Sequence, residues 1–215
     1  TILKERQSAC FDMMSLMVEA DLLPEHIPSE SNFCLREITR SQRIDEMEFY
    51  YVIKNMSKHD LIKVFEKHYP EGHENFVFAR DLNGLNFDME DGILTGSIDL
   101  VFEREGQYYI LDWKSNHLGN EASLYGKEIL KNEVRHSYYF LQYHIYTLAL
   151  HLLLEQKLHE AYRYERDFGG VIYAFVRGVN GESYNGLHWD RLPYGLVSDM
   201  KALIIEGRSV EEILS

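Results

Sequence analysis

The 215-residue sequence predicts one α/β domain in which a mixed central sheet is flanked by helices. Three observations support this fold class: two apolar strands joined by a short turn between residues 96 and 116, a helix-periodic stretch over residues 137–157, and an apolar strand at residues 170–176. With 45% hydrophobic and 27% charged residues, the chain is long enough for one sizeable core. We expect residues 1–31 to form a helical segment and linker, and residues 32–215 to form the core.

The first third of the chain predicts a helix, two strands and a second helix. Residues 2–22 have the pattern of an amphipathic helix, which the proline-containing linker at residues 24–31 ends. Strand-like segments follow at residues 33–38 and 47–53. A capping-box spacing then predicts a helix over residues 57–68. The apolar positions of the first helix include Leu3, Cys10, Met13, Met14, Met17 and Val18.

The remaining elements follow from the same signals. Residues 71–86 show neither period and are expected to form a loop. After the hairpin come the long helix and a weakly alternating strand at residues 170–176. Residues 209–212 have the spacing of another capping box, which predicts a final helix.

Three charged side chains lie within the apolar strands of the hairpin. Asp99, Asp112 and Lys114 are costly there unless they are paired or bound to a metal. If Glu105 and Gly106 form a two-residue loop, Asp99 faces Asp112, and Lys114 projects to the same face. A three-residue loop with a glycine bulge would shift the register by one and turn Asp99 to the far side. Turn chemistry alone leaves both registers open.

The first register predicts a metal-dependent hydrolase. Two close carboxylates repel each other, whereas Mg²⁺ or Mn²⁺ stabilises both charges. Such an ion activates a water and polarises a phosphoryl oxygen, and the ammonium group of Lys114 would orient the nucleophile or offset negative charge. This chemistry is phosphodiester hydrolysis. The alternative interpretation is a buried Asp112–Lys114 ion pair that only holds the hairpin together.

Two further groups of residues lie downstream of the hairpin. Gln142 and Tyr146 share a face of the predicted helix, where they could contact phosphate or a metal-bound water. The alternative interpretation is that Tyr146 is a core residue whose hydroxyl reaches water. Lys127, Lys131 and Arg135 recur every four residues and would form a basic stripe that contacts DNA. The alternative interpretation is an ordinary solvated helix face.

These motifs together resemble those of a known family. Gly-x-x-Asp, Asp-x-Lys and Gln-x-x-x-Tyr, with longer runs within residues 40–215, are similar to the RecB-type branch of the PD-(D/E)xK nuclease superfamily. The resemblance implies a restriction-endonuclease-like fold and a Mg²⁺ cofactor, with Mn²⁺ or Ca²⁺ as alternative occupants. It implies that Asp99, Asp112 and the backbone carbonyl of Trp113 hold the metal, that Lys114 is catalytic, and that Gln142 and Tyr146 orient the lysine, the water or the scissile phosphate.

The resemblance also implies a biological role. The chain would be the metal-dependent deoxyribonuclease part, of exodeoxyribonuclease V type, of a helicase–nuclease that processes double-strand breaks. Its partners would be DNA, the other subunits of a RecBCD-like complex and a RecA-type recombinase. Relatives carry a histidine metal ligand near the start of the domain, but residues 1–22 contain none, which suggests a fragment of a larger subunit with weaker metal binding.

Composition limits the other function classes. The net charge of −13 argues against a free-standing DNA binder and leaves open a noncatalytic acidic docking module that recruits a recombinase or another subunit. Only two cysteines occur, Cys10 and Cys34, which favours a reducing compartment, the bacterial cytoplasm. The most apolar run, residues 148–154, is too short to cross a membrane. No phosphate-binding loop is present, so the chain is not itself an ATPase motor.

Overall fold

The computed structural model describes the chain except for residues 1, 24–32, 86–87, 90 and 182–184. The chain forms two compact units, each of which is described separately below. The first unit comprises Thr1–Met47, Ile98–His136 and Gly169–Arg191, and the second comprises Glu48–Ser97, Ser137–Phe168 and Leu192–Ser215.

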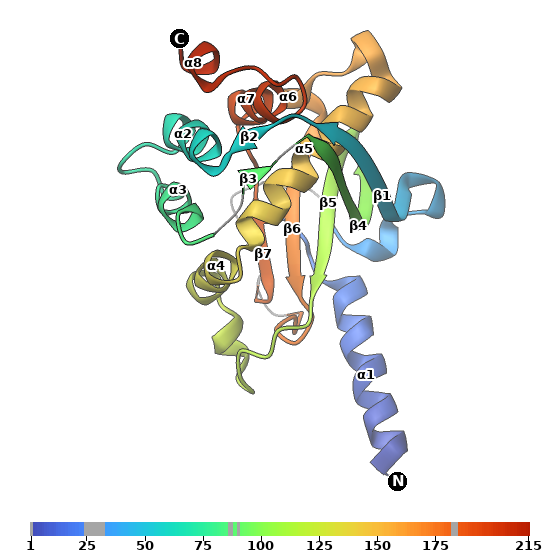
Figure 1. Ribbon diagram of the computed structural model, residues 1–215. Helices are drawn as coiled ribbons and strands as arrows, with labels where there is room; N and C mark the ends of the chain where they lie inside the picture. The colour runs from blue at the N-terminus through green and yellow to red at the C-terminus, as the bar shows by residue number, and fades with distance from the viewer. Residues whose placement is uncertain (1, 24–32, 86–87, 90, 182–184) are drawn as a thin grey trace. The chain divides into compact units, whose positions relative to one another are not determined.

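A five-stranded sheet has the order β1-β4-β5-β6-β7 (Figure 1). Strands β4 and β5 are antiparallel, as are β6 and β7, whereas the arrows of β5 and β6 point the same way in Figure 1. The sheet is therefore mixed, and the predicted α/β fold class is confirmed. The strands are β1 (Arg43–Ile53), β4 (Gly92–Arg104), β5 (Gln107–Lys114), β6 (Phe168–Phe175) and β7 (Leu187–Asp190).

The hairpin of β4 and β5 has the two-residue loop. Glu105 and Gly106 form the turn, with φ values of 54° and 80°. Positive φ at both central residues is the signature of a type I′ turn, whose twist matches that of the flanking strands. The three-residue alternative is excluded. The paired positions run from Arg104 opposite Gln107 to Leu100 opposite Leu111.

Strand β6 is buried along its whole length, which explains its weak alternation in the sequence. A strand covered on both faces needs apolar residues at successive positions, not at every second one. Within the first unit, a hydrophobic core lies against one face of the sheet. Its members include Met17, Phe33, Leu100, Phe102, Tyr109, Leu111, Ile172 and Ala174.

The helices of the first unit include α1 (Ile2–Glu19), as predicted, and α4 (Lys127–His136), with the short 3₁₀ helices η1 (Leu35–Glu37), η2 (Arg40–Gln42) and η3 (Ala122–Tyr125). Most of the apolar side chains of α1 are exposed. Met17 is buried and Met13 partly so, while the side chain of Leu3 lies outside the described residues, as does the linker.

The strand predicted at residues 33–38 is wrong. This segment forms η1, in which the amide of Ile38 donates to the carbonyl of Leu35. Phe33 is fixed by the end of α1, because its amide donates to Asp21 and its carbonyl accepts from Leu22. The apolar residues of the segment thus fill the core from a turn instead of pairing with a sheet.

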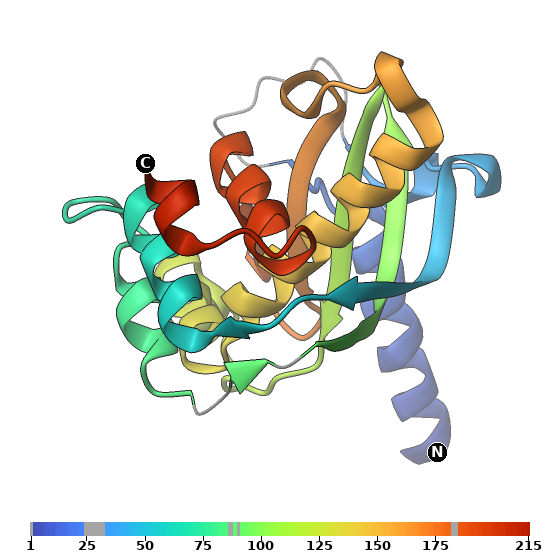
Figure 2. The ribbon, with the colours of Figure 1, turned by 45° about the horizontal axis from the view of Figure 1, so that its top comes forward.

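The second unit is mainly helical. Its longest helix is α5 (Tyr139–Leu158), close to the predicted bounds. Helix α2 (Lys58–His68) lies against α3, α7 and α8, and α5 lies against α7 (Figure 2). The other elements are α3 (Val77–Leu82), η4 (His159–Ala161), α6 (Tyr164–Asp167), α7 (Tyr194–Ile204), α8 (Val210–Leu214) and a two-stranded sheet of β2 (Met56–Ser57) and β3 (Asp88–Met89).

Both predicted capping boxes of this unit are confirmed, at Ser57 and Ser209. The expected loop at residues 71–86 is wrong in part, because α3 forms within it. Phe78, Ala79 and Leu82 are buried there, but a helix of 6 residues is too short for its period to be recognised in the sequence. Throughout the described residues, no helix combines the length and the apolarity that a bilayer span requires.

Candidate active site

The centre of the site is a buried ion pair at the end of β5. The ammonium nitrogen of Lys114 lies 2.7 Å from Oδ2 of Asp112. The two residues project to the same face because they are two positions apart on a strand. Asp112 is 4% exposed and Lys114 is 7% exposed, so neither charge is well solvated.

Asp99 comes from the neighbouring strand β4 and is half-buried. The observed register, continued by one position beyond Leu100, places it opposite Asp112. Its Oδ2 atom accepts a hydrogen bond of 2.9 Å from the backbone amide of Trp113. The structure thus brings together Asp99, Asp112 and Lys114, as the two-residue loop predicts.

The environment raises the pKa of Asp112. Burial is the largest cause, because it disfavours the charged form; the neighbouring charge of Asp99 acts in the same direction, and Lys114 opposes both. Two carboxylates and one ammonium group therefore lie close together at this site, and a bound cation would stabilise the charged form of both carboxylates.

Tyr173 of β6 is part of the site, although the sequence analysis did not select it. Its fully buried ring lies beneath the ammonium group of Lys114, with 4.4 Å between Nζ and the ring centroid. An aromatic face attracts a desolvated cation and so fixes the position of Lys114. The sequence carries no signal for this contact, because it depends on β5 and β6 being neighbours in the sheet.

Gln142 and Tyr146 lie on α5 in the second unit. The side-chain amide of Gln142 donates a hydrogen bond of 2.8 Å to the hydroxyl of Tyr146, so the two groups share a helix face as expected. The ring of Tyr146 also packs edge-to-face on Phe49. Their role beside the acidic pair stays a prediction.

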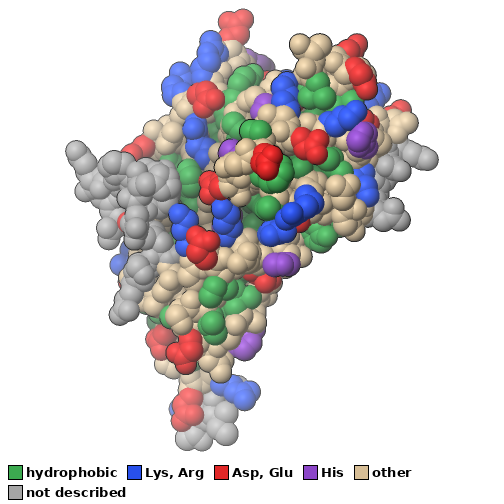
Figure 3. Space-filling view, turned by 90° about the vertical axis from the view of Figure 1, so that its left-hand side faces the viewer, with side chains coloured by type: hydrophobic (Ala, Val, Ile, Leu, Met, Phe, Trp, Pro, Cys, Tyr) green, Lys and Arg blue, Asp and Glu red, His purple; other side chains and the backbone are tan. Residues whose placement is uncertain are grey.

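The predicted basic stripe lies on α4 of the first unit. Lys127 is exposed, whereas Lys131 and Arg135 are half-buried and take part in other interactions. Glu133 on the same helix accepts a hydrogen bond of 2.8 Å from the side-chain amide of Asn116, which ties α4 to the segment that follows Lys114. Figure 3 shows one face of the molecule, on which basic side chains are interspersed with acidic ones. Contact of the stripe with DNA stays a prediction.

The available donors suit a hard divalent cation. Asp99 and Asp112 supply carboxylate oxygens, and Trp113, the residue after Asp112, adds a backbone carbonyl. Within the described part of the chain, no three His, Cys, Asp or Glu side chains form a ligand cluster. The donors named above are all oxygen atoms, which hard divalent cations prefer, whereas zinc sites are typically built from nitrogen and sulfur ligands.

Comparison with known families agrees with this geometry. A profile of the family described as the PD-(D/E)XK nuclease superfamily matches residues 17–194, most of the chain. The chain belongs to the PD-(D/E)XK nuclease superfamily, whose members use divalent metal ions. The restriction-endonuclease-like fold implied by the resemblance is confirmed.

Within this superfamily, the chain is similar to RecBCD enzyme subunit RecB from several bacteria. It is 40% identical to the Haemophilus influenzae protein over 177 residues, which are 81% of this chain and 14% of that protein. It is 36% identical to the Escherichia coli K12 protein over 189 residues, 86% of this chain and 15% of that protein. For the Mycobacterium tuberculosis H37Rv protein the identity is 34% over 176 residues, 74% of this chain and 16% of that protein. The chain thus spans a small part of these curated relatives, and the resemblance to the RecB-type branch is confirmed.

Proposed function

We propose that the chain is a Mg²⁺-dependent deoxyribonuclease domain that hydrolyses phosphodiester bonds. The observation that carries this proposal is the buried Asp112–Lys114 pair, with Asp99 beside it on the adjacent strand of the hairpin. A purely structural ion pair would not need a second carboxylate that raises the pKa of the first.

The residues of the site take separate roles in this proposal. Asp99, Asp112 and the backbone carbonyl of Trp113 hold the metal, with Mn²⁺ or Ca²⁺ as alternatives to Mg²⁺. When bound, the ion lowers the pKa of a water molecule and polarises the phosphoryl group. The ammonium group of Lys114 offsets the negative charge that develops on the phosphate. Tyr173 is a positioning residue that holds the ammonium group in place.

Residues outside the hairpin contact the substrate. Gln142 and Tyr146 orient Lys114, the water or the scissile phosphate. Lys127, Lys131 and Arg135 bind backbone phosphates of the DNA, which helps an acidic chain to hold a polyanion.

The relatives named RecBCD enzyme subunit RecB suggest the context of the reaction. We propose that the two units form one nuclease domain over residues 1–215, within a larger subunit of a RecBCD-like complex. It would cleave strands delivered by a helicase during double-strand break processing and recombinational repair in the bacterial cytoplasm. Two free cysteines, one exposed and one buried, are compatible with that reducing compartment.

A second function is favoured by the net charge of −13. An acidic surface suits a basic protein partner, so the domain would also dock a RecA-type recombinase or another subunit. The two functions can coexist, because the nuclease site is formed by a few buried residues and docking would use the surface.

The test is cleavage of a fluorescent oligonucleotide in Mg²⁺ by the Asp112→Asn variant. This change keeps the side-chain shape but removes the charge, so we expect cleavage to fall at least about a hundredfold. Asp12→Asn, a change at an exposed acid of α1, is the matched control and should keep full activity. Cleavage that is unchanged in Asp112→Asn would overturn the catalytic assignment. Recombinase binding measured on the same variant tests the docking function separately.

A further inference from the structure

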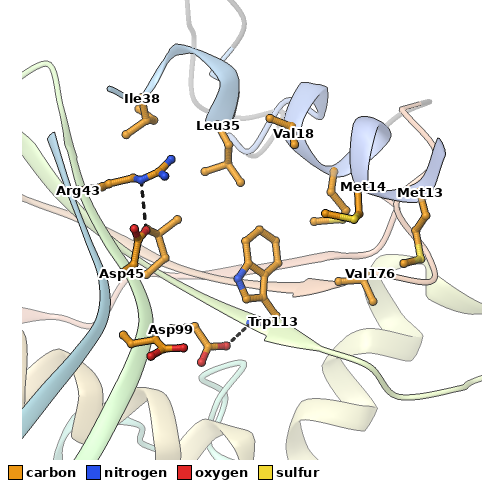
Figure 4. A pocket seen from close by; sticks show the side chains of 13 residues that line it. Met13, Met14, Val18, Leu35, Ile38, Arg43, Asp45, Asp99, Trp113 and Val176 are labelled. Carbon is orange, nitrogen blue, oxygen red and sulfur yellow. Dashed lines mark hydrogen bonds and ion pairs between the residues drawn. The ribbon is translucent and has the colours of Figure 1, made fainter. Parts of the chain in front are cut away.

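A pocket of 580 Å³ lies in the first unit, next to the candidate active site (Figure 4). Its volume is in the range of pockets that hold small molecules. Its lining residues come from α1, η1, β1, β4, β5 and the segments after η1 and β6. Its apolar residues include Met13, Met14, Met17, Leu35, Trp113 and Val176.

We propose that this pocket is a nucleobase subsite, which holds one base of the DNA strand beside the scissile phosphate on the indole ring of Trp113. The inference rests on the proposed nuclease function and assigns a role to the indole ring of Trp113, which that function does not use.

The walls suit a flat aromatic ring. Trp113 is 37% exposed, and it faces the methionines of α1 across the pocket (Figure 4). Methionine is flexible and polarisable and makes favourable contacts with aromatic rings. Stacking of a base on an aromatic side chain is a general way to bind unpaired nucleotides without sequence preference.

The charged residues that line the pocket are mainly acidic. They include Asp45, Glu46 and Asp99, and the one Lys or Arg among the described lining residues is Arg43, which lies 3.2 Å from Asp45 in an ion pair. Negative charges repel a phosphodiester or an acidic peptide but do not repel a neutral base. The charge pattern therefore selects the base, while the backbone phosphate remains outside the pocket.

The position of Trp113 connects the pocket to the chemistry. Trp113 lies between Asp112 and Lys114 in β5, so its side chain projects to the opposite face of the strand. Its backbone amide donates to Asp99, which lines the pocket and is also a proposed metal ligand. A base held on Trp113 would thus fix the register of the strand relative to the metal site.

Intrinsic fluorescence provides a direct test, because the chain has only two tryptophans. In the Trp189→Phe variant, Trp113 is the sole tryptophan, and its emission is recorded with excitation that tyrosine does not absorb. Titration with a single-stranded oligonucleotide in Ca²⁺ should quench its emission. An abasic site walked along the oligonucleotide should abolish the quenching at one position only. Emission of Trp113 that stays unchanged when the oligonucleotide binds would overturn the proposal. The same unchanged emission is expected if another segment of a longer subunit fills the pocket.

Variants provide an independent measurement. Trp113→Ala should raise the Kd for single-stranded DNA about fivefold or more, and Trp113→Phe should restore most of the affinity. The matched control is Phe11→Ala, which removes an aromatic ring of α1 that is 70% exposed and does not line the pocket; it should leave Kd unchanged. The effects of the abasic position and of Trp113→Ala on Kd should be non-additive, because both remove the same stacking contact. Additive effects on Kd would contradict the subsite.

The outcomes separate this inference from the nuclease assignment. Metal-dependent cleavage that is lost in Asp112→Asn, together with unquenched Trp113, overturns the subsite alone. Quenching of Trp113 in a chain that does not cleave DNA supports the subsite and contradicts the nuclease function.

Discussion

Replacement of Lys114 by methionine tests the buried charge pair most sharply. Methionine keeps much of the length of the lysine stem but removes the charge, so Asp112 is left buried without its partner. Breaking a buried ion pair at one end costs about 3–5 kcal/mol. Both side chains of the pair are less than a tenth exposed, so solvent screening does not reduce this value greatly. We expect the free energy of unfolding at neutral pH to fall by about that amount.

The loss should depend on pH with a defined sign. The pKa of Asp112 is raised in the folded state, chiefly by burial, so the folded chain binds a proton more tightly than the unfolded chain. The stability contributed by protonated Asp112 is present below the unfolded pKa and is lost as pH rises through the folded pKa. Removal of Lys114 removes an interaction that lowers this pKa. The pH range in which protonated Asp112 contributes stability therefore extends to higher pH in the variant. The deficit of Lys114→Met should be smaller near pH 4 than near pH 7.5.

Urea denaturation followed by circular dichroism at both pH values measures these differences. The matched control is Lys157→Met, at an exposed lysine of α5, which should change stability by no more than about 0.5 kcal/mol. If Lys114→Met is as harmless as Lys157→Met, or if its deficit grows on acidification, the reasoning about the buried pair is refuted.

Three further outcomes follow from individual contacts. Tyr173→Leu should lower kcat for DNA cleavage about tenfold with little change in KM, because the ring that fixes Lys114 is lost. Tyr173→Phe keeps the ring and should retain kcat. Equal losses of kcat in the two variants would rule out the cation–π role. Gly106→Ala should destabilise the chain by ~1 kcal/mol in thermal denaturation, since the turn requires φ of 80° there, and an unchanged melting temperature would contradict the type I′ turn. Ser57→Ala should lower the free energy of unfolding by ~1 kcal/mol, because the backbone amide of Asp60 loses its acceptor, the Ser57 side chain. An unchanged free energy of unfolding would mean that the capping box does not stabilise α2.

Local signals were sufficient to predict much of the fold. Glu105-Gly106 indicated a two-residue turn, which is one of the two registers that turn chemistry allowed, and the structure has this turn and the pairing of Asp99 with Asp112 that follows from it. Capping boxes located the starts of α2 and α8, and helical periodicity located α5. Each of these signals acts over a few residues, so the sequence contains it directly.

Contacts between distant segments could not be predicted in this way. Tyr173 reaches Lys114 only because β6 lies beside β5 in the sheet. The segment around the turn at Leu35–Glu37 has the composition of a strand, but Phe33, just before the turn, donates to Asp21, which follows α1. The amphipathic pattern of α1 does not reveal that much of its apolar face is exposed and that part of it lines a pocket. Such features depend on tertiary packing, which overrides local preference.

The central claim is that Asp99 and Asp112 together hold a divalent cation. A crystal structure of the chain soaked in Mn²⁺, with anomalous diffraction recorded to locate the ion, tests it most directly. The account predicts one anomalous peak within about 2.0–2.6 Å of a carboxylate oxygen of each residue. A bound ion that contacts neither residue, or an Asp99 side chain turned to the opposite face of the sheet, would contradict it.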